Sequence, residues 1–416
     1  MAQKFILASG MPLLVETMPH LRSIASGIWV NCGSVYEHPA INGVSHFLEH
    51  MLFKGTPRRD ALAIAAEMEA VGGVLNAFTG KEQTCYYARS LDEHFSLQLD
   101  LLADMYQNSL LDEEEFAREK KVIIEEINMY EDSPDEVAMD LFTSTIFPEH
   151  PYGRPIAGNL ASVGDLQRDT LADHYRHFYN PHNAVLAIAG NITAEQAIEQ
   201  ANKYFAANSS GQPAPTIEQL AAAGGEGFIA KDIEQSHICM GFPGLPLGDD
   251  DYYAATIIAN ALGGGASSRL FQEVREKRGL AYSAYCYLEA YVHGGFMMAY
   301  AATTPKNAEQ LIKIIAEQFA LLAQKGLTTK EINQSKDQLK GGLLLNLEST
   351  ANVMSKLGRT ELALGKIYNA EETAAKLMSV TEADIQRTIA KLISPEKLVL
   401  AQVGPQQAPV NLKELL

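Results

Sequence analysis

The chain has 416 residues, of which 47% are apolar and 20% are charged. It is too long for one ordinary domain, and its composition excludes both a disordered chain and a fibrous repeat. Its 33 basic and 51 acidic residues leave a formal charge of −18, which argues against a nucleic-acid partner or an anionic membrane surface and favours a positively charged substrate.

The N-terminal segment and the cysteines bear on the cellular compartment. The first twenty residues contain short apolar runs broken by two prolines and a glutamate, unlike a secretory signal. We find no run of about eighteen apolar residues that could span a bilayer, so a cytoplasmic protein without membrane contact is expected. Four cysteines without a CxxC pair are expected to be buried, reduced thiols: Cys32, Cys85, Cys239 and Cys286.

The strands are predicted from apolar and β-branched runs that are bounded by turn residues. Six such runs are Ile24–Cys32, Cys85–Arg89, Val185–Ala189, His237–Phe242, Phe296–Ala302 and Leu398–Val403. In each half of the chain, strands come first, then a helix, further strands, several helices and a closing strand. This order predicts the α+β class, with helices packed on one face of a mostly antiparallel sheet.

The segment His46-Phe47-Leu48-Glu49-His50 is the sharpest chemical signal in the sequence. It lies in an apolar, helix-compatible run, and residues four apart on a helix share one face, so His46 and His50 can bind one metal ion. Glu49 lies at the edge of that face, where it can reach a metal-bound water without being a ligand. This HxxEH order is the inverzincin motif, which needs a third ligand and leaves zinc an open position. The alternative is that the paired histidines only cap or pack a helix.

A second long amphipathic helix is predicted for Glu115–Met129. Glu119 and Glu126 lie seven residues apart, which is two turns along one face. Most carboxylates on such a helix are solvated, but a glutamate on a semi-buried face is costly unless it is paired or bound to a metal. These two glutamates are therefore candidates for metal chemistry, and Glu125 is a rival by adjacency.

The chain divides near its middle. The segment Ala206–Gly227 is rich in Gly, Pro, Ser and Ala, which is typical of a linker. We expect an N-terminal catalytic domain over residues 1–215, a linker over 216–227, and a C-terminal domain over 228–416.

The two halves resemble each other. Pro181–Gly190 reads as a Pro-led strand that ends in glycine, and Pro395–Gly404 repeats this pattern. Leu111 and Leu327 begin matching stretches at the start of a long helix. Similarity with a period of about two hundred residues indicates gene duplication and not a solenoid.

The second half keeps the framework but drops the candidate ligands. The alignment of the halves places Ser335 opposite Glu119 and Gly342 opposite Glu126. The helix that corresponds to HFLEH, Ala254–Leu262, contains neither His nor Glu. We therefore expect one chemical centre in two homologous scaffolds.

The stretch from Gly43 to Thr56, GVSHFLEHMLFKGT, closely resembles the catalytic beta subunit of the mitochondrial processing peptidase. Over nearly its whole length the chain looks like the pitrilysin and mitochondrial processing peptidase family of zinc endopeptidases, and specifically its short, single-unit bacterial members. The resemblance implies one zinc ion per chain on His46 and His50, with Glu49 as the base that activates water. Manganese or cobalt would also suit the ligands.

The resemblance also assigns the carboxylates of the second helix. The family's distal ligand falls on Glu126 and its supporting glutamate falls on Glu119. Family spacing and helix phase both favour Glu126 over Glu125. Glu119 would orient a histidine ligand or balance charge behind the metal.

Two further stretches resemble substrate-handling parts of the family. The resemblance implies that an edge strand contacts extended substrate through Asn76, Ala77 and Phe78, although an ordinary hairpin describes this stretch equally well. It also implies that Arg275 and Tyr282 hold substrate and stabilise the oxyanion. Residue statistics alone favour a surface charge and a core aromatic for this pair.

The resemblance implies a zinc endopeptidase that cleaves unfolded or presequence-like peptides, basic ones included, inside a closed chamber. Because one chain carries one unit, we expect a homodimer in which Arg275 and Tyr282 of each chain complete the zinc site of the other. One alternative is a non-catalytic or partner subunit of the same fold, and another is a peptide-binding protein with a structural zinc.

Overall fold

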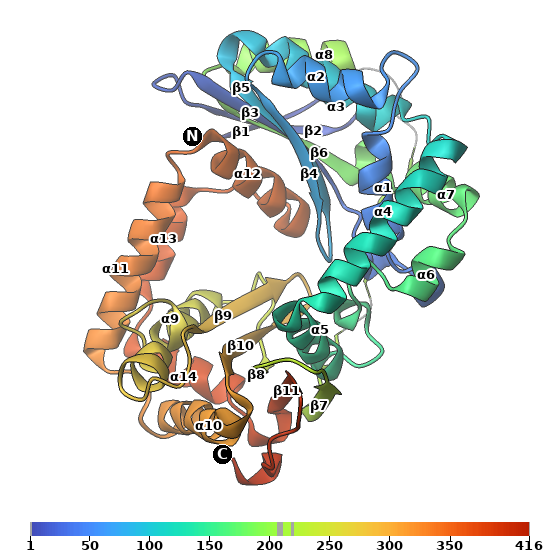
Figure 1. Ribbon diagram of the computed structural model, residues 1–416. Helices are drawn as coiled ribbons and strands as arrows, with labels where there is room; N and C mark the ends of the chain where they lie inside the picture. Colours follow the sequence, from blue (N-terminus) through green and yellow to red (C-terminus); the bar gives the residue numbers. More distant parts are fainter. Residues whose placement is uncertain (1, 206–210, 218–219, 416) are drawn as a thin grey trace. The chain divides into compact units, whose positions relative to one another are not determined.

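The computed structural model describes residues 2–205, 211–217 and 220–415 (Figure 1). Parts of the expected linker, residues 206–210 and 218–219, lie outside the described residues. The chain forms two compact units, each with its own sheet and core. Unit 1 contains residues 1–127, 155–217 and 344–369, and unit 2 contains residues 128–154, 218–343 and 370–416.

Unit 1 is built on a six-stranded sheet of order β1-β2-β6-β3-β5-β4. Its strands are β1 (Gln3–Ile6), β2 (Pro12–Thr17), β3 (Ser23–Val30), β4 (Val74–Thr79), β5 (Thr84–Leu91) and β6 (Ala184–Gly190). Strands β2 and β6 are parallel, and all other neighbours are antiparallel. The central strands β3 and β6 are almost wholly buried, which requires cover on both faces of the sheet.

Helices of unit 1 supply that cover. One face packs against the main core, which includes side chains of α1, α3 and α7, and α12 covers the other face, where Trp29 Nε1 lies 3.4 Å from Met354 Sδ (Figure 1). The helices are α1 (Val44–Leu52), α2 (Ala61–Glu69), α3 (Phe95–Asn108), α4 (Glu113–Asp132, which begins in this unit), α6 (Leu160–Asp165), α7 (Arg168–Phe178), α8 (Ala194–Phe205) and α12 (Thr350–Leu364).

Unit 2 repeats this plan on a five-stranded sheet of order β7-β11-β8-β10-β9. Its strands are β7 (Gly225–Ala230), β8 (Ser236–Pro243), β9 (Ala284–Tyr291), β10 (Gly294–Thr303) and β11 (Val399–Gly404). Its helices are α5 (Pro134–Ile146), α9 (Tyr252–Gly263), α10 (Ala308–Lys325), α11 (Thr329–Asn346, which begins in this unit), α13 (Ala370–Ser379) and α14 (Glu382–Leu392). Helices α9, α10 and α14 build the core on one face, and α5 packs on the other.

The α+β class and the mostly antiparallel sheets expected from the sequence are confirmed. Two details differ from the expectation. Each sheet carries a helix on its second face, and that helix comes from the other half of the sequence, so the units do not follow the division into residues 1–215 and 228–416. Residues 225–227, expected in the linker, form the start of β7 because they pair in parallel with β11.

The duplication is visible in single contacts. In the alignment of the halves Lys120 on α4 corresponds to Lys336 on α11. Lys120 Nζ donates to two backbone carbonyls at the end of α6, at 2.9 and 2.6 Å. Lys336 Nζ donates to two at the end of α13, at 3.0 and 2.5 Å. The two units therefore join corresponding pairs of helices through corresponding lysines, of which Lys336 is buried and Lys120 half-buried.

Across the described ranges, we find no helix that combines the length and the apolar character needed to cross a membrane. The four cysteines are buried and free, as expected.

Candidate metal centre

Helix α1 carries the HxxEH segment and begins at a backbone position that only glycine tolerates. Gly43 has a φ of 99°, and a Cβ atom there would lie 2.6 Å from the carbonyl oxygen of Ala157. One side of α1 is apolar and buried in the core of unit 1, where Phe47 stacks on Phe116 of α4 at 4.6 Å between ring centroids. This packing fixes which side of α1 points away from the core.

A distant carboxylate caps α1. Gly43 itself provides no side-chain cap, and Glu37, which is 3% exposed, takes that role. It accepts hydrogen bonds from the backbone N–H groups of Gly43 at 2.7 Å and Ser45 at 2.8 Å, and from Asn42 Nδ2 at 2.8 Å. A helix N-terminus carries unpaired donors and the positive end of the helix dipole, which favour an acceptor here. Burial raises the pKa of Glu37, and the hydrogen bonds from Asn42, Ser45 and Gly43 act against this rise.

A buried polar cluster lies behind the first turn of α1. His174 Nε2 of α7 lies 3.1 Å from Cys32 Sγ and 3.1 Å from Ser45 Oγ. Burial, together with the nearby His177, lowers the pKa of His174 to about 3, so its imidazole is neutral at ordinary pH. The cluster attaches α1 to α7 and to the segment that follows β3.

Helix α4 presents the two predicted glutamates on one side. Ile123 and Ile127 are buried in the core, and Glu119 is also buried at 5% exposure, whereas Glu126 is half-buried and Glu125 is exposed. The helix phase therefore turns Glu119 and Glu126 towards α1 and Glu125 towards solvent, as the heptad spacing predicts.

His46, His50 and Glu126 offer one ligand atom each within 4.8 Å of one another. His46 Nε2 lies 3.7 Å from Glu126 Oε1, and His50 Nε2 lies 3.5 Å from Glu126 Oε2. Ligand atoms at tetrahedral angles around zinc are about 3.4 Å apart. The three side chains thus fit a zinc ion that keeps a fourth position open.

The two histidines differ in their other ring nitrogen. His50 Nδ1 lies 3.1 Å from Glu119 Oε2, a carboxylate–histidine contact of the kind that orients metal ligands. Glu119 also forms an ion pair with Lys54 Nζ at 2.7 Å. His46 Nδ1 is buried and, among the described residues, has no hydrogen-bond partner.

These surroundings give the two imidazoles opposite pKa shifts in the metal-free protein. Burial, and secondarily the neighbouring His50, lowers the pKa of His46 to about 4. Burial also acts to lower the pKa of His50, but hydrogen bonds to Glu119 and Glu126 outweigh it and raise that pKa to about 9. Because a metal binds the neutral ring, a proton and a metal compete for His50 but not for His46 at neutral pH.

Glu49 lies beside this centre without being one of its three ligands. Thr79 Oγ1, at the end of β4, donates a hydrogen bond to Glu49 Oε2 at 2.6 Å. Burial raises the pKa of Glu49, and the Thr79 bond acts against this rise. A carboxylate whose pKa is raised towards neutrality suits a general base.

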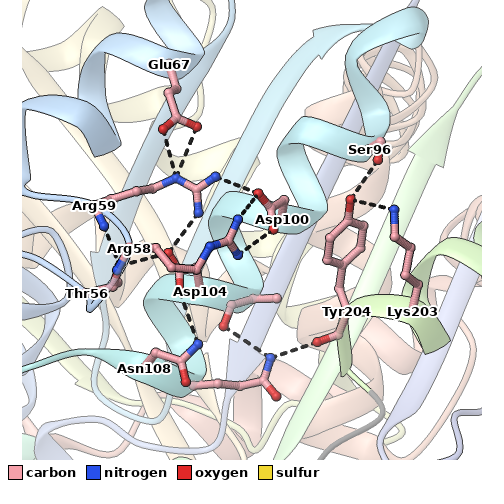
Figure 2. Close-up of polar contacts among 12 residues, drawn as sticks. Thr56, Arg58, Arg59, Glu67, Ser96, Asp100, Asp104, Asn108, Lys203 and Tyr204 are labelled. Carbon is pink, nitrogen blue, oxygen red and sulfur yellow. Dashed lines mark hydrogen bonds and ion pairs between the residues drawn. The ribbon is translucent and has the colours of Figure 1, made fainter.

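The segment after α1 is held by a polar network that Figure 2 shows. Arg59 is buried and bonds Glu67 at 3.0 Å, Asp100 at 2.5 Å and Asp104 at 2.8 Å. Thr56 Oγ1 donates to Asp104 as well, at 2.8 Å. These bonds fix the segment that follows Lys54. They therefore help to hold Lys54 where it forms its ion pair with Glu119.

The predicted substrate strand lies at the edge of the sheet of unit 1, where, among the strands that the structure describes, β4 pairs only with β5. The strand alternates: Asn76 and Phe78 are exposed, whereas Ala77 and Thr79 are half-buried on the opposite face. Thr79 joins this edge to Glu49, so an open strand edge begins next to the candidate base.

Arg275 and Tyr282 belong to unit 2. Arg275 lies in a π-helical turn, Phe271–Glu276, and its guanidinium is 4.7 Å from the centre of the Tyr282 ring. Tyr282 precedes β9 by two residues and is 83% exposed, so the core aromatic that residue statistics favour is wrong. The two side chains form one exposed cation–aromatic pair.

Sequence reasoning missed three polar side chains of this region. Glu37 lies seven residues before the first residue of the helix that it caps, Lys54 follows the motif by one turn, and Thr79 ends a strand. Their roles depend on loops and on sheet pairing, and we see no local pattern that could have revealed them.

Two copies of one α+β unit, of which only one has an HxxEH helix and a second helix that turns Glu119 and Glu126 towards it, define the architecture of an inverzincin-type peptidase unit. The insulinase (peptidase family M16) model matches residues 13–160, and the peptidase M16 inactive domain model matches residues 165–339. The chain belongs to peptidase family M16.

Curated relatives extend over almost the whole chain. An uncharacterized zinc protease of Bacillus subtilis is 40% identical over 405 residues, which are 97% of this chain and 98% of the relative. One of Streptomyces coelicolor is 40% identical over 408 residues, with 96% and 88% covered. A Helicobacter pylori protease of known structure has the same fold, with a TM-score of 0.93, 22% identity, and 97% and 99% of the two chains covered.

Proposed function

We propose that the protein is a zinc-dependent endopeptidase that hydrolyses unfolded or presequence-like peptides. The observation that carries this proposal is the convergence of His46, His50 and Glu126 beside Glu49. The names of the relatives, which are zinc proteases, support the choice of metal and reaction.

Each side chain has a role that its surroundings support. His46, His50 and Glu126 would hold the zinc ion, which when bound lowers the pKa of water and polarises a carbonyl. Glu49 accepts the proton of the attacking water and passes it to the leaving amine. The hydrogen bond from Thr79 holds the Glu49 carboxylate in place for this role. Glu119 keeps the His50 ring oriented.

The substrate is proposed to bind as an extended strand along β4, near Asn76, Ala77 and Phe78. The open edge of β4 and its link to Glu49 through Thr79 support this position. Arg275 and Tyr282 are proposed to grip the peptide from a partner chain in a closed homodimer. The net charge of −18 supports basic peptides as substrates. The cytoplasm is proposed as the location.

Digestion of a mixed peptide library by the full chain, with and without a chelator, tests the proposal. We expect cleavage that the chelator abolishes and zinc restores. The Glu49→Gln variant should keep zinc and lose activity by about 100-fold or more, while the matched Glu125→Gln control on exposed α4 surface keeps both. Cleavage by Glu49→Gln would contradict the mechanism, and a zinc-loaded wild type without cleavage would favour the non-catalytic alternative.

A further inference from the structure

Unit 2 has a row of aromatic side chains on one face of its sheet that the proposed chemistry does not use. We call it the tyrosine face and define it by Tyr285 and Tyr287 of β9, Tyr300 of β10 and His237 of β8. Tyr300 in this row is buried at 7% exposure, and the other members are half-buried. The Tyr285 and Tyr300 rings stack with centroids 5.0 Å apart, and Tyr287 follows at 6.2 Å from Tyr285. His237 Nδ1 lies 2.8 Å from the Tyr300 hydroxyl. The rings thus form a continuous, mutually supported row.

Strand register places the row on one side of the sheet. Tyr300 pairs directly with Tyr285, and directly paired residues of antiparallel strands point to the same face. Phe296 lies four residues before Tyr300 on β10 and so points to the same face. Its ring centroid is 5.4 Å from that of Phe142 on α5. Helix α5 packs over β7, β11 and β8 (Figure 1), and beyond it Tyr285 and Tyr287 stay half-exposed.

The duplication indicates what these positions do. Strand β9 is the edge strand of its sheet, as β4 is in unit 1. The closing strands β6 and β11 are equivalent in the two halves. When the paired residues are followed from each of these strands to the edge of its sheet, Tyr285 falls at the position of Asn76 and Tyr287 at that of Phe78. Unit 2 has therefore lost the metal ligands but holds large, half-exposed rings where unit 1 has its proposed peptide-contacting residues.

The charge around the tyrosine face is negative. Asp135 and Glu136 are exposed in the first turn of α5, and both act electrostatically on Tyr285. Asp135 also acts on Tyr300 and His237, and Glu289 acts on Tyr287. Burial first, with these carboxylates adding to it, raises the pKa of Tyr285 to about 12, so its hydroxyl stays protonated.

We infer that the tyrosine face is a subsite for an arginine or lysine side chain of an extended peptide. The faces of aromatic rings attract cations, most strongly where carboxylates stand nearby, and a planar guanidinium can stack on them. The same unit already shows this recognition, because the Arg275 guanidinium lies 4.7 Å from the Tyr282 ring centre and 4.8 Å from that of Phe271. The inference rests on the proposed function only in taking a peptide as the ligand.

Fluorescence anisotropy on the full-length Glu49→Gln protein tests the inference without cleavage. The probes are two labelled peptides that differ only in arginine or its neutral analogue citrulline. We expect tighter binding of the arginine peptide, and a loss of this preference by about five-fold when Tyr285 and Tyr287 are both changed to leucine. Asp135→Asn with Glu136→Gln should reduce the preference similarly, and added salt should weaken it.

Two controls make the result specific. Tyr285→Phe keeps the ring and should keep the preference, and Asp250→Asn removes an exposed acid before α9, on the other side of the sheet, and should change nothing. An unchanged preference in both the leucine and the acid variants would overturn the inference, as would equal affinity for the two peptides. Failure of wild-type cleavage with the preference intact would overturn the proposed function alone.

Discussion

The Glu119 carboxylate offers the sharpest test of how the centre is held. It is 5% exposed and bonds His50 Nδ1 at 3.1 Å and Lys54 Nζ at 2.7 Å. Glu119→Gln keeps the shape but removes the charge that supports the ligand, and loss of such a partner weakens metal binding by about 10- to 100-fold, or about 1.4–2.7 kcal/mol. The measurement is the zinc dissociation constant, by competition with a chromogenic chelator.

The exposed Glu125 on the same helix provides the matched control. Glu125→Gln removes the same charge from α4 without touching the His50 ring and should leave zinc affinity within two-fold of wild type. If Glu119→Gln also binds zinc within two-fold of wild type, the contact between Glu119 and His50 does not support the metal. Adding Lys54→Met would then complete a double-mutant cycle that separates the His50 contact from the ion pair.

Three further predictions concern neighbouring groups. Glu37→Gln leaves buried donors of α1 unsatisfied and should lower the free energy of unfolding in urea by about 2–4 kcal/mol; a change below about 0.5 kcal/mol would contradict its role as the cap. The pKa of His174 falls from 6.5 to about 3 on folding, so the unfolded chain binds more protons and stability falls by up to about 1.4 kcal/mol per unit as pH drops below about 6.5; His174→Asn should flatten that loss in urea titrations at pH 7 and 5, and equal slopes would refute it. Thr79→Val removes a bond that lowers the pKa of Glu49, so the acid limb of the kcat/KM profile should move to higher pH with zinc retained, and an unmoved limb would count against Glu49 as the base.

Short-range periodicity accounts for the parts of the site that the sequence revealed. His46 and His50 are four apart and Glu119 and Glu126 seven apart, so helical geometry alone places each pair on one side of its helix. The internal repeat added that only one half carries the ligands. That both helices would meet was an implication of the resemblance, because no local pattern encodes the packing of α1 against α4.

The features that the sequence did not reveal depend on long-range contacts. The edge strand β9 mixes polar, small and aromatic residues, and it is a strand because β10 pairs with it. Helices α5 and α12 look like other amphipathic helices in the sequence. Each packs on the sheet formed by the other half of the chain, and only the need of each sheet for cover on its second face explains this placement. Tyr282 is exposed because it lies in the turn before β9, where residue statistics cannot place it.

The zinc content of the purified full chain tests the central claim most directly. Metal analysis after dialysis should find one zinc per chain in wild type and in Glu125→Gln, and zinc well below one in Glu126→Gln. Because Glu126 oxygens lie 3.7 and 3.5 Å from the two histidine nitrogens, its loss leaves only two ligands. A wild type without zinc, or a Glu126→Gln variant that retains one zinc per chain with unchanged affinity, would contradict the account.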